Sequence, residues 1–386
     1  MNITSIDKQY VAPTYGRFSL ELVSGKGSIL KDNNGKEYID MTSGIGVTAF
    51  GTADELWMAA VTEQLHKLQH VSNLYYTEPC AKLAQLLCEK TGLSKVFFCN
   101  SGAEANDCAI KYARKYSMEK KGSQYYNIIT LVNSFHGRTL TTLSATGQEH
   151  YHELFQPLTP GFIHVEVGDV EGLKKAVKEN PTAGIMMEMV QGEGGVIALP
   201  ADFVKAVEDI CTTQDIPMMI DEVQTGNGRT GKLYAFMHFG LKPDIVSTAK
   251  GLGGGLPIGA TMVSEKLQNV LQPGDQGSTY GGNPVACAGA LSVINRLDDA
   301  FLATVQEKSD YCFQQLSNAE GVEAVSGMGL MIGIKTVKPA KDVVAAAMEM
   351  GVLCLTAKDK VRLLPALNIP MEQLKKAIEI IKEAIL

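Results

Sequence analysis

The chain has 386 residues, of which 45% are hydrophobic and 20% are charged, and its formal net charge is -7. This length suits one large domain plus a smaller one. The acidic balance, without a stripe of Lys and Arg, argues against nucleic-acid binding. No run of about 18 uncharged apolar residues predicts a membrane span, and the first residues lack the pattern of a secretion signal. We therefore expect a soluble, cytoplasmic protein that acts on small molecules.

The eight cysteines show no CxxC pair and lie mostly in apolar segments. Disulfides are typical of oxidising compartments, and closely spaced cysteines are typical of metal sites. We therefore expect reduced thiols and no metal centre.

The amino-terminal half begins with short strands between residues 17 and 41, joined by a tight turn at Asn33, Asn34 and Gly35, which tolerate a positive φ. From residue 96 onward, strands alternate with helices, which predicts a mostly parallel sheet covered on both faces. Helices are predicted over 54–68, 79–91, 103–121, 170–179 and 201–215, and strands over 96–99, 127–132, 162–166, 184–190, 217–223, 244–248 and 259–264.

The carboxyl-terminal part has a different order of predicted helices and strands. A long helical region is predicted from 285 to about 318, followed by strands near 328–336, 352–356 and 361–364 and helices over 340–350 and 370–385. These elements fit a small α+β domain that the amino-terminal strands complete. We expect residues 1–42 to join the small domain, 43–284 to form the large domain, and 285–386 to supply a connecting helix and the rest of the small domain.

The stretch 217–255 carries the strongest chemical signal. Two apolar runs within it deliver charged groups at their carboxyl ends, Asp221 with Glu222 and then Lys250. Ligands bind at that end of the strands in open α/β sheets. Lys250 precedes an uncharged glycine-rich run, a setting that lowers the pKa of an amine and makes it nucleophilic. We interpret Lys250 as an imine-forming amine and Asp221 as the partner of a pyridine nitrogen.

Two nucleotide-binding alternatives compete with this interpretation. The acid pair also fits a Walker B strand, but the chain has no GxxxxGK[ST] segment. Residues 226–231 match GxGxxG, which keeps a nicotinamide-dependent dehydrogenase open. Against it, a polar segment led by two acids separates these glycines from the strand, and the acids repel a pyrophosphate.

Two further constellations follow strands. Ser101, Gly102 and Ala103 open a predicted helix, where free N–H groups suit a phosphate, although a capping box made by Ser101 and Glu104 explains them equally well. In Ser134–Thr139, Phe135 suits stacking on a flat ring and Arg138 suits a carboxylate. The alternative is a core Phe beside a surface Arg, and His136 is as compatible with a structural role as with a functional one.

Four more residues are candidates for a ligand site. Glu193, ahead of two glycines, suits pairing with a mobile arginine, the alternative being a solvated loop acid. Ser278 and Thr279, among glycines, suit a second phosphate contact. Arg362 lies within an apolar strand, where a charge is costly unless it meets an anion.

Together these segments resemble the class III, fold-type I pyridoxal-phosphate (PLP) aminotransferases. The segments SGAEAN, FHGRT, QGEGG, DEVQTGNGRTG, PDIVSTAKGLGGGLPIGA and GSTYGGNPVACA occur in the family's order over nearly the whole chain. The resemblance implies an α/β fold with a mostly parallel central sheet and a small α+β domain from both termini. Two departures concern substrate details: residues 50–56 replace the family's GHxHP segment, and Met189 stands where proline is frequent.

The resemblance also implies roles for individual residues. Lys250 would bind the cofactor aldehyde and carry a proton between substrate and cofactor, while Asp221 would keep the pyridine nitrogen protonated. Other cofactor contacts would come from Ser101, Gly102, Ala103, Phe135, Glu188, Val223 and Gln224. Ser278 and Thr279 would reach the phosphate from a second subunit, which implies a homodimer with shared active sites.

The implied reaction transfers the δ-amino group of N-acetylornithine to 2-oxoglutarate, a step of arginine biosynthesis. Arg138 and Arg362 would meet the two carboxylates of 2-oxoglutarate. N-acetylornithine has no carboxylate near its reacting carbon, so Glu193 would neutralise Arg362 instead. Alternative donors are ornithine, succinylornithine, succinyl-diaminopimelate and 4-aminobutyrate, and a catalytically silent PLP-binding dimer is an alternative of another class.

Overall fold

A seven-stranded sheet forms the centre of the computed structural model, which describes residues 3–386. Strand β12 runs antiparallel to both of its neighbours, and the other pairs joining β11, β10, β7, β5 and β6 are parallel. The predicted mostly parallel sheet is therefore confirmed. In sheet order the strands are β4 (Lys95–Cys99), β12 (Gly259–Val263), β11 (Ile245–Thr248), β10 (Met218–Asp221), β7 (Thr182–Met187), β5 (Asn127–Leu131) and β6 (Phe162–Val165).

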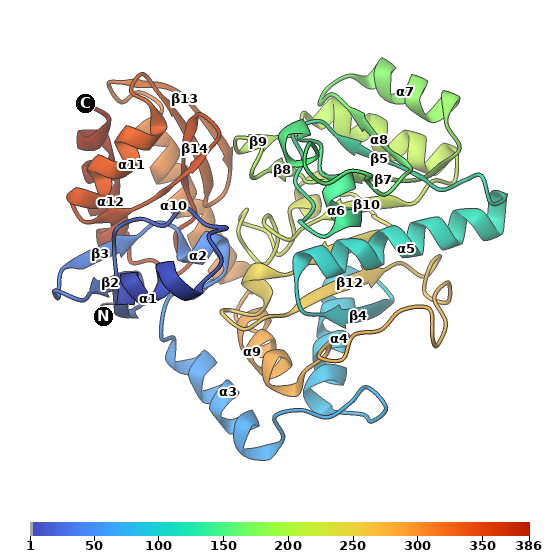
Figure 1. The fold of residues 1–386 in the computed structure, drawn as a ribbon, viewed down its shortest axis with the longest axis horizontal. Coiled ribbons are helices and arrows are strands. Elements are labelled where there is room, and N and C mark those ends of the chain that lie inside the picture. The colour runs from blue at the N-terminus through green and yellow to red at the C-terminus, as the bar shows by residue number, and fades with distance from the viewer. Residues whose placement is uncertain (1–2) are drawn as a thin grey trace.

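Helices cover both faces of this sheet, which explains why its strands are almost continuously apolar. Along β7, Met186 belongs to the core beneath helix α5, whereas its neighbours Ile185 and Met187 belong to the core that contains α8. Figure 1 shows α5 running along the sheet. The helices of this part are α3 (Glu55–Lys67), α4 (Glu78–Thr91), α5 (Gly102–Lys121), α6 (Leu140–Ala145), α7 (Val170–Glu179), α8 (Ala201–Thr213) and α9 (Pro284–Ile294).

The two ends of the chain meet in one of two smaller sheets, and Figure 1 shows the blue amino-terminal strands beside the red carboxyl-terminal elements. Strand β3 pairs in parallel with β15, so the amino-terminal hairpin extends a carboxyl-terminal element. One sheet contains β1 (Leu22–Lys26), β2 (Ile29–Asp32), β3 (Glu37–Asp40) and β15 (Val352–Leu353), and the other β13 (Val322–Met328), β14 (Met331–Thr336), β17 (Lys360–Leu363) and β16 (Leu355–Ala357). Beside them lie α1 (Ile3–Tyr10), α2 (Ser43–Gly46), α10 (Asp299–Leu316), α11 (Ala340–Glu349) and α12 (Met371–Ile385).

Three predicted elements differ from the structure. The predicted strand 352–356 is divided between two sheets, because Val352 and Leu353 pair with β3 whereas 355–357 pair with β17. The helical region 285–318 is two helices, because Asp298 accepts a hydrogen bond from the Phe301 backbone and starts α10 afresh. The predicted strand 184–190 ends at Met187, and Val190–Gln191 forms β8, which pairs with β9 (Ile197–Ala198) outside the central sheet. Helices α1, α2 and α6, strand β9 and most of strand β13 were not predicted. None of the helices within residues 3–386 has the length and apolar character needed to cross a bilayer.

Candidate active site

A cavity of about 600 Å³ lies where β4, β5, β7, β10 and β11 end. This is the carboxyl edge of the parallel strands, the usual ligand site of such sheets. Ten of the predicted site residues line it together: Ser101, Gly102, Ala103, Phe135, Arg138, Glu188, Asp221, Val223, Gln224 and Lys250. The strand ends thus bring into one cavity predicted residues that lie up to 149 positions apart in the chain, from Ser101 to Lys250.

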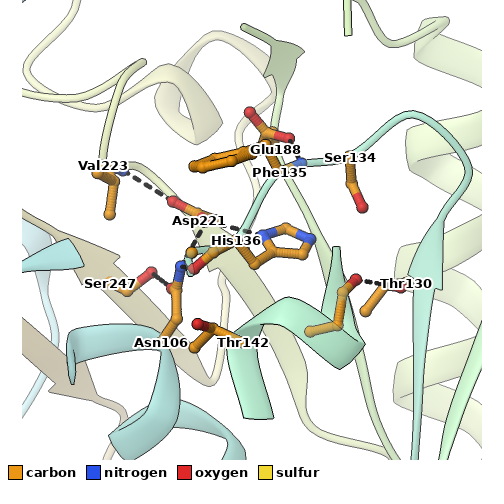
Figure 2. A network of polar contacts seen from close by, with 12 residues as sticks. Asn106, Thr130, Ser134, Phe135, His136, Thr142, Glu188, Asp221, Val223 and Ser247 are labelled. Atoms are coloured by element: carbon orange, nitrogen blue, oxygen red, sulfur yellow. Dashed lines mark hydrogen bonds and ion pairs between the residues drawn. The ribbon is translucent and has the colours of Figure 1, made fainter. Parts of the chain in front are cut away.

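Asp221, the last residue of β10, is held by a network that Figure 2 shows. The Asn106 side-chain amide donates to its Oδ2 at 2.7 Å, His136 Nδ1 lies 2.8 Å from the same oxygen, and the Val223 backbone donates to Oδ1 at 3.0 Å. The Ser247 hydroxyl in turn donates to Asn106 Oδ1 at 2.5 Å and so fixes the orientation of the amide. The carboxylate therefore has a defined position in the cavity wall.

Lys250 follows β11 and has a φ of 45°, in the left-handed region that residues with a side chain rarely adopt. Burial lowers the pKa of its amine, the negative charge of Glu193 opposes this shift, and Arg362 adds to it. A lowered pKa leaves more of the amine neutral at a given pH. Lys250 therefore has the environment of a nucleophilic lysine.

The start of α5 forms another wall of the cavity. The Glu104 backbone donates to Ser101 Oγ at 3.2 Å, and the Glu104 carboxylate accepts from the Asn100 backbone at 2.8 Å, so the capping interaction is present. The first N–H groups of a helix lack carbonyl partners within it, so the cap leaves this end able to bind an anion. A Cβ atom at Gly102 would lie 2.6 Å from Val223 Cγ1, which only glycine avoids.

Phe135 and Glu188 are coupled through the backbone. The Phe135 backbone donates to Glu188 Oε1 at 2.9 Å, and Gly192 donates to Oε2 at 3.2 Å. Burial raises the pKa of the Glu188 carboxyl to about 7. Arg138 is exposed, and its guanidinium carbon lies 4.0 Å from the centre of the Tyr151 ring and 5.4 Å from that of Phe135. The cation is thus held beside the aromatic wall of the cavity.

Arg362 and Glu193 form an ion pair beside this cavity. Arg362 Nη1 lies 2.5 Å from Glu193 Oε1, and the same nitrogen lies 3.4 Å from the side-chain oxygen of Gln224, which lines the cavity. Burial by itself raises the pKa of Glu193, but Arg362 and Lys250 outweigh it and hold that pKa below its ordinary value. Arg362 Nε is buried and has no partner among residues 3–386. The predicted pairing of these two residues is therefore present.

Ser278 and Thr279 do not line the cavity within one chain. Ser278 Oγ accepts a hydrogen bond from the Asn100 side chain at 3.1 Å, and Thr279 is exposed. Residues 226–231 do not open a helix, and Arg229 within them is buried, donating to the backbone oxygens of Leu330 and Pro365 at 3.1 and 2.5 Å. This segment therefore lacks the helix terminus that binds a dinucleotide pyrophosphate.

Several cavity residues were not assigned a role from sequence. Asn106 lies inside the SGAEAN segment and is buried. A polar amide on the buried side of the predicted helix was the sequence feature that could have indicated its role. His136 is buried, and its Nε2 has no hydrogen-bond partner among residues 3–386. Tyr15 and Val47 line the cavity from segments distant in sequence, where no local pattern marks them.

The residues of the cavity fit PLP. Asp221 offers a fixed acceptor for a protonated ring nitrogen, and Lys250 offers an amine of lowered pKa for an aldehyde. The glycine at position 102 keeps the start of α5 open for a phosphate. Phe135 and Val223 supply apolar walls for a flat ring.

The profile of the class-III aminotransferase family matches residues 10–385. The chain belongs to this family and is a PLP-dependent aminotransferase of fold type I. It is 49% identical to an acetylornithine aminotransferase of Haemophilus ducreyi over 99% of this chain and 98% of that one. Among solved structures, it is similar to an N-acetylornithine aminotransferase from Stenotrophomonas maltophilia, with a TM-score of 0.86, 32% identity and coverage of 99% and 98%. It is also similar to the ornithine aminotransferase from Toxoplasma gondii, with a TM-score of 0.94, 30% identity and coverage of 99% and 94%.

Proposed function

We propose that this enzyme transfers the δ-amino group of N-acetylornithine to 2-oxoglutarate and serves arginine biosynthesis in the cytoplasm. The observation that carries the proposal is the ion pair of Arg362 with Glu193 beside a cavity that also presents Arg138. Two arginines match the two carboxylates of 2-oxoglutarate. Because Glu193 neutralises Arg362, the same site also accepts a donor whose reacting end has no carboxylate. Full-length identity to the Haemophilus ducreyi enzyme supports this choice of donor.

The residues of the chain divide the work. Lys250 Nζ takes the proton from the carbon that bears the reacting nitrogen, for which its lowered pKa suits it. Asp221, held by Asn106 and His136, keeps a proton on the pyridine nitrogen. When bound, PLP supplies an electron sink for the carbon that loses its proton. Asp221 is buried and Lys250 is only partly exposed, which limits the access of water to these two groups.

The remaining cavity residues hold the cofactor in this proposal. The start of α5 and Ser101 receive the phosphate, Phe135 and Val223 flank the ring, and Gln224 binds the ring hydroxyl. These assignments are supported by the position of all four side chains in the cavity wall. Glu188 braces the Phe135 backbone through its hydrogen bond of 2.9 Å.

We further propose a homodimer in which Ser278 and Thr279 complete the site of the other subunit. An exposed apolar patch supports this assembly, because the Asn73 side chain ties the loop that carries it to the backbone of Ser278 at 3.0 Å. Large exposed apolar patches mark protein interfaces. The patch contains Leu74, Tyr75, Tyr76 and Tyr280, which are 88%, 67%, 105% and 62% exposed. We also retain the division into segments 1–42, 43–284 and 285–386.

Amino-donor profiling of the PLP-loaded enzyme tests the function. Single-turnover changes in cofactor absorbance are followed with N-acetylornithine, succinylornithine, ornithine, succinyl-diaminopimelate and 4-aminobutyrate, followed by 2-oxoglutarate. We expect the largest kcat/KM with N-acetylornithine. Ornithine is the second candidate, because the fold matches the Toxoplasma gondii ornithine aminotransferase with a TM-score of 0.94. A higher kcat/KM with ornithine than with N-acetylornithine would show that ornithine is the preferred donor. Absence of turnover with every amine would refute the proposal.

A further inference from the structure

Trp57, the only tryptophan of the chain, packs against the glycine loop that follows Lys250. It lies in the first turn of α3, directly after the segment that departs from the family pattern. The Trp57 backbone donates to Asp54 Oδ1 at 2.9 Å, and Asp54 itself pairs with Arg296 at 2.9 Å. The start of α3 is therefore anchored, and the position of the indole is fixed with it.

The indole is attached to the loop by one hydrogen bond. Trp57 Nε1 donates to the Gly253 carbonyl oxygen at 3.0 Å, and the Leu256 backbone donates to the same oxygen at 3.2 Å. Among residues 3–386, no other side chain forms a hydrogen bond with the backbone of 251–256. Three consecutive glycines, 253–255, give this loop high conformational freedom. The bond from Trp57 therefore adds a side-chain restraint from α3 to a loop that is otherwise held by its own backbone hydrogen bonds.

The indole ring also packs so closely against Gly254 and Gly289 that a side chain at either position would collide with it. A Cβ atom at Gly254 would lie 2.8 Å from Trp57 Nε1, and one at Gly289 of α9 would lie 2.9 Å from the same atom. Real Cβ atoms do not approach other heavy atoms so closely. The indole is thus in direct contact with the backbones of the loop and of α9.

This loop leads directly into the cavity wall. Residues 255–258 line the cavity, and the preceding Gly251 lies against the Gly46 carbonyl, 3.5 Å from where its Cβ would be. Val47, next to Gly46, lines the cavity as well. A shift of the glycine loop would therefore move two parts of the wall together.

We propose that Trp57 is a positioning residue that sets the shape of the wall formed by residues 255–258 and thereby the fit of the amino donor. The inference rests on the proposed aminotransferase function and deepens it by assigning a determinant of donor specificity outside the cavity. Trp57 does not line the cavity. It acts through the hydrogen bond to Gly253 and through contact with Gly254.

The test compares PLP-loaded wild type with Trp57→Phe, which keeps a ring and removes the N–H group. Met58→Leu, at the next and more exposed position of α3, is the matched control. KM and kcat for N-acetylornithine, the thermal midpoint and hydrogen exchange of peptides covering 251–258 are measured. For Trp57→Phe we expect KM to rise about fivefold, the usual effect of losing one neutral hydrogen bond, with a smaller change in kcat. Exchange in 251–258 should accelerate, and the control should match wild type.

Gly289→Ala in α9 provides a second variant, because its added Cβ would lie 2.9 Å from Trp57 Nε1 and displaces the indole while Trp57 and the glycine loop keep their sequence. The same rise in KM and in local exchange is expected. The proposal is overturned if exchange in 251–258 equals that of Met58→Leu, or if exchange rises equally throughout the protein while KM stays constant. If the wild type prefers another amine, the proposed donor is wrong, yet local exchange and KM for that amine still decide the role of Trp57.

Discussion

Replacing Glu193 by Gln should separate the two half-reactions of the enzyme. The substitution keeps the shape of the side chain and removes the charge that lies 2.5 Å from Arg362 Nη1. Arg362 is only 4% exposed, whereas Glu193 is 28% exposed, so the pair is neither fully buried nor on the surface. Exposed pairs contribute less than about 1 kcal/mol and breaking buried pairs costs about 3–5 kcal/mol. For this partly buried pair we expect removal of the Glu193 charge to change the free energy of substrate binding by about 1–3 kcal/mol, which is about 5- to 150-fold in a binding constant.

The direction follows from what replaces Glu193 at Arg362. A carboxylate of glutamate or 2-oxoglutarate no longer has to displace Glu193, so the glutamate half-reaction should need a lower substrate concentration. N-acetylornithine has no carboxylate near its reacting carbon, so it leaves Arg362 uncompensated and its half-reaction should weaken. Single-turnover absorbance measures each half separately, and Glu171→Gln, which removes an exposed carboxylate paired with Lys174 at 2.8 Å, is the control. Equal loss in both halves would refute the reasoning.

Three other changes test the site and its surroundings. Lys250→Ala should abolish the attachment of PLP that borohydride fixes, which mass spectrometry detects as loss of the cofactor mass from the protein, and attachment in the variant would contradict the assignment. In wild-type apoenzyme, the rate of PLP attachment should rise with pH, with a midpoint below the ordinary lysine pKa. Asn106→Ala removes hydrogen bonds to Asp221 and to the His136 carbonyl, and should lower the free energy of unfolding by about 1–3 kcal/mol in urea titrations; an unchanged midpoint and slope would contradict this. Burial raises the pKa of the Glu222 carboxyl to about 7 in the folded protein. As pH rises from 5 to 8, the free energy of unfolding of the wild type should therefore fall by up to about 3 kcal/mol relative to that of Glu222→Gln. Equal pH dependence of the two free energies would show that this pKa is not raised.

Much of the site follows from local sequence. An apolar run that ends in Asp221, and a second one that leads to Lys250, predicted two neighbouring strands that deliver an acid and an amine to one edge of a parallel sheet. The structure places both residues in one cavity, because the carboxyl ends of parallel strands meet at the same edge. The start of α5 was predictable for the same reason, and Ser101 proved to be the cap of that helix.

Local pattern failed where an element depends on distant partners. The sequence near Glu188 is apolar on both sides, so it predicted one strand through residue 190, whereas the chain leaves the sheet after Met187 and pairs with β9 instead. The boundary between α9 and α10 depends on the capping bond of Asp298. Such hydrogen bonds override propensity without changing the apolar periodicity.

By itself, the sequence determined the alternating α/β order, the acid and amine at two strand ends and the membership in the aminotransferase family. Only the tertiary structure decided which side chains support them: Asn106 reaches Asp221 across 115 positions, Arg362 reaches Glu193 across 169, and Trp57 reaches Gly253 across 196. Periodicity and propensity describe neighbours within a few residues. Contacts at these separations exist only once the sheet, its helices and the terminal strands have packed together.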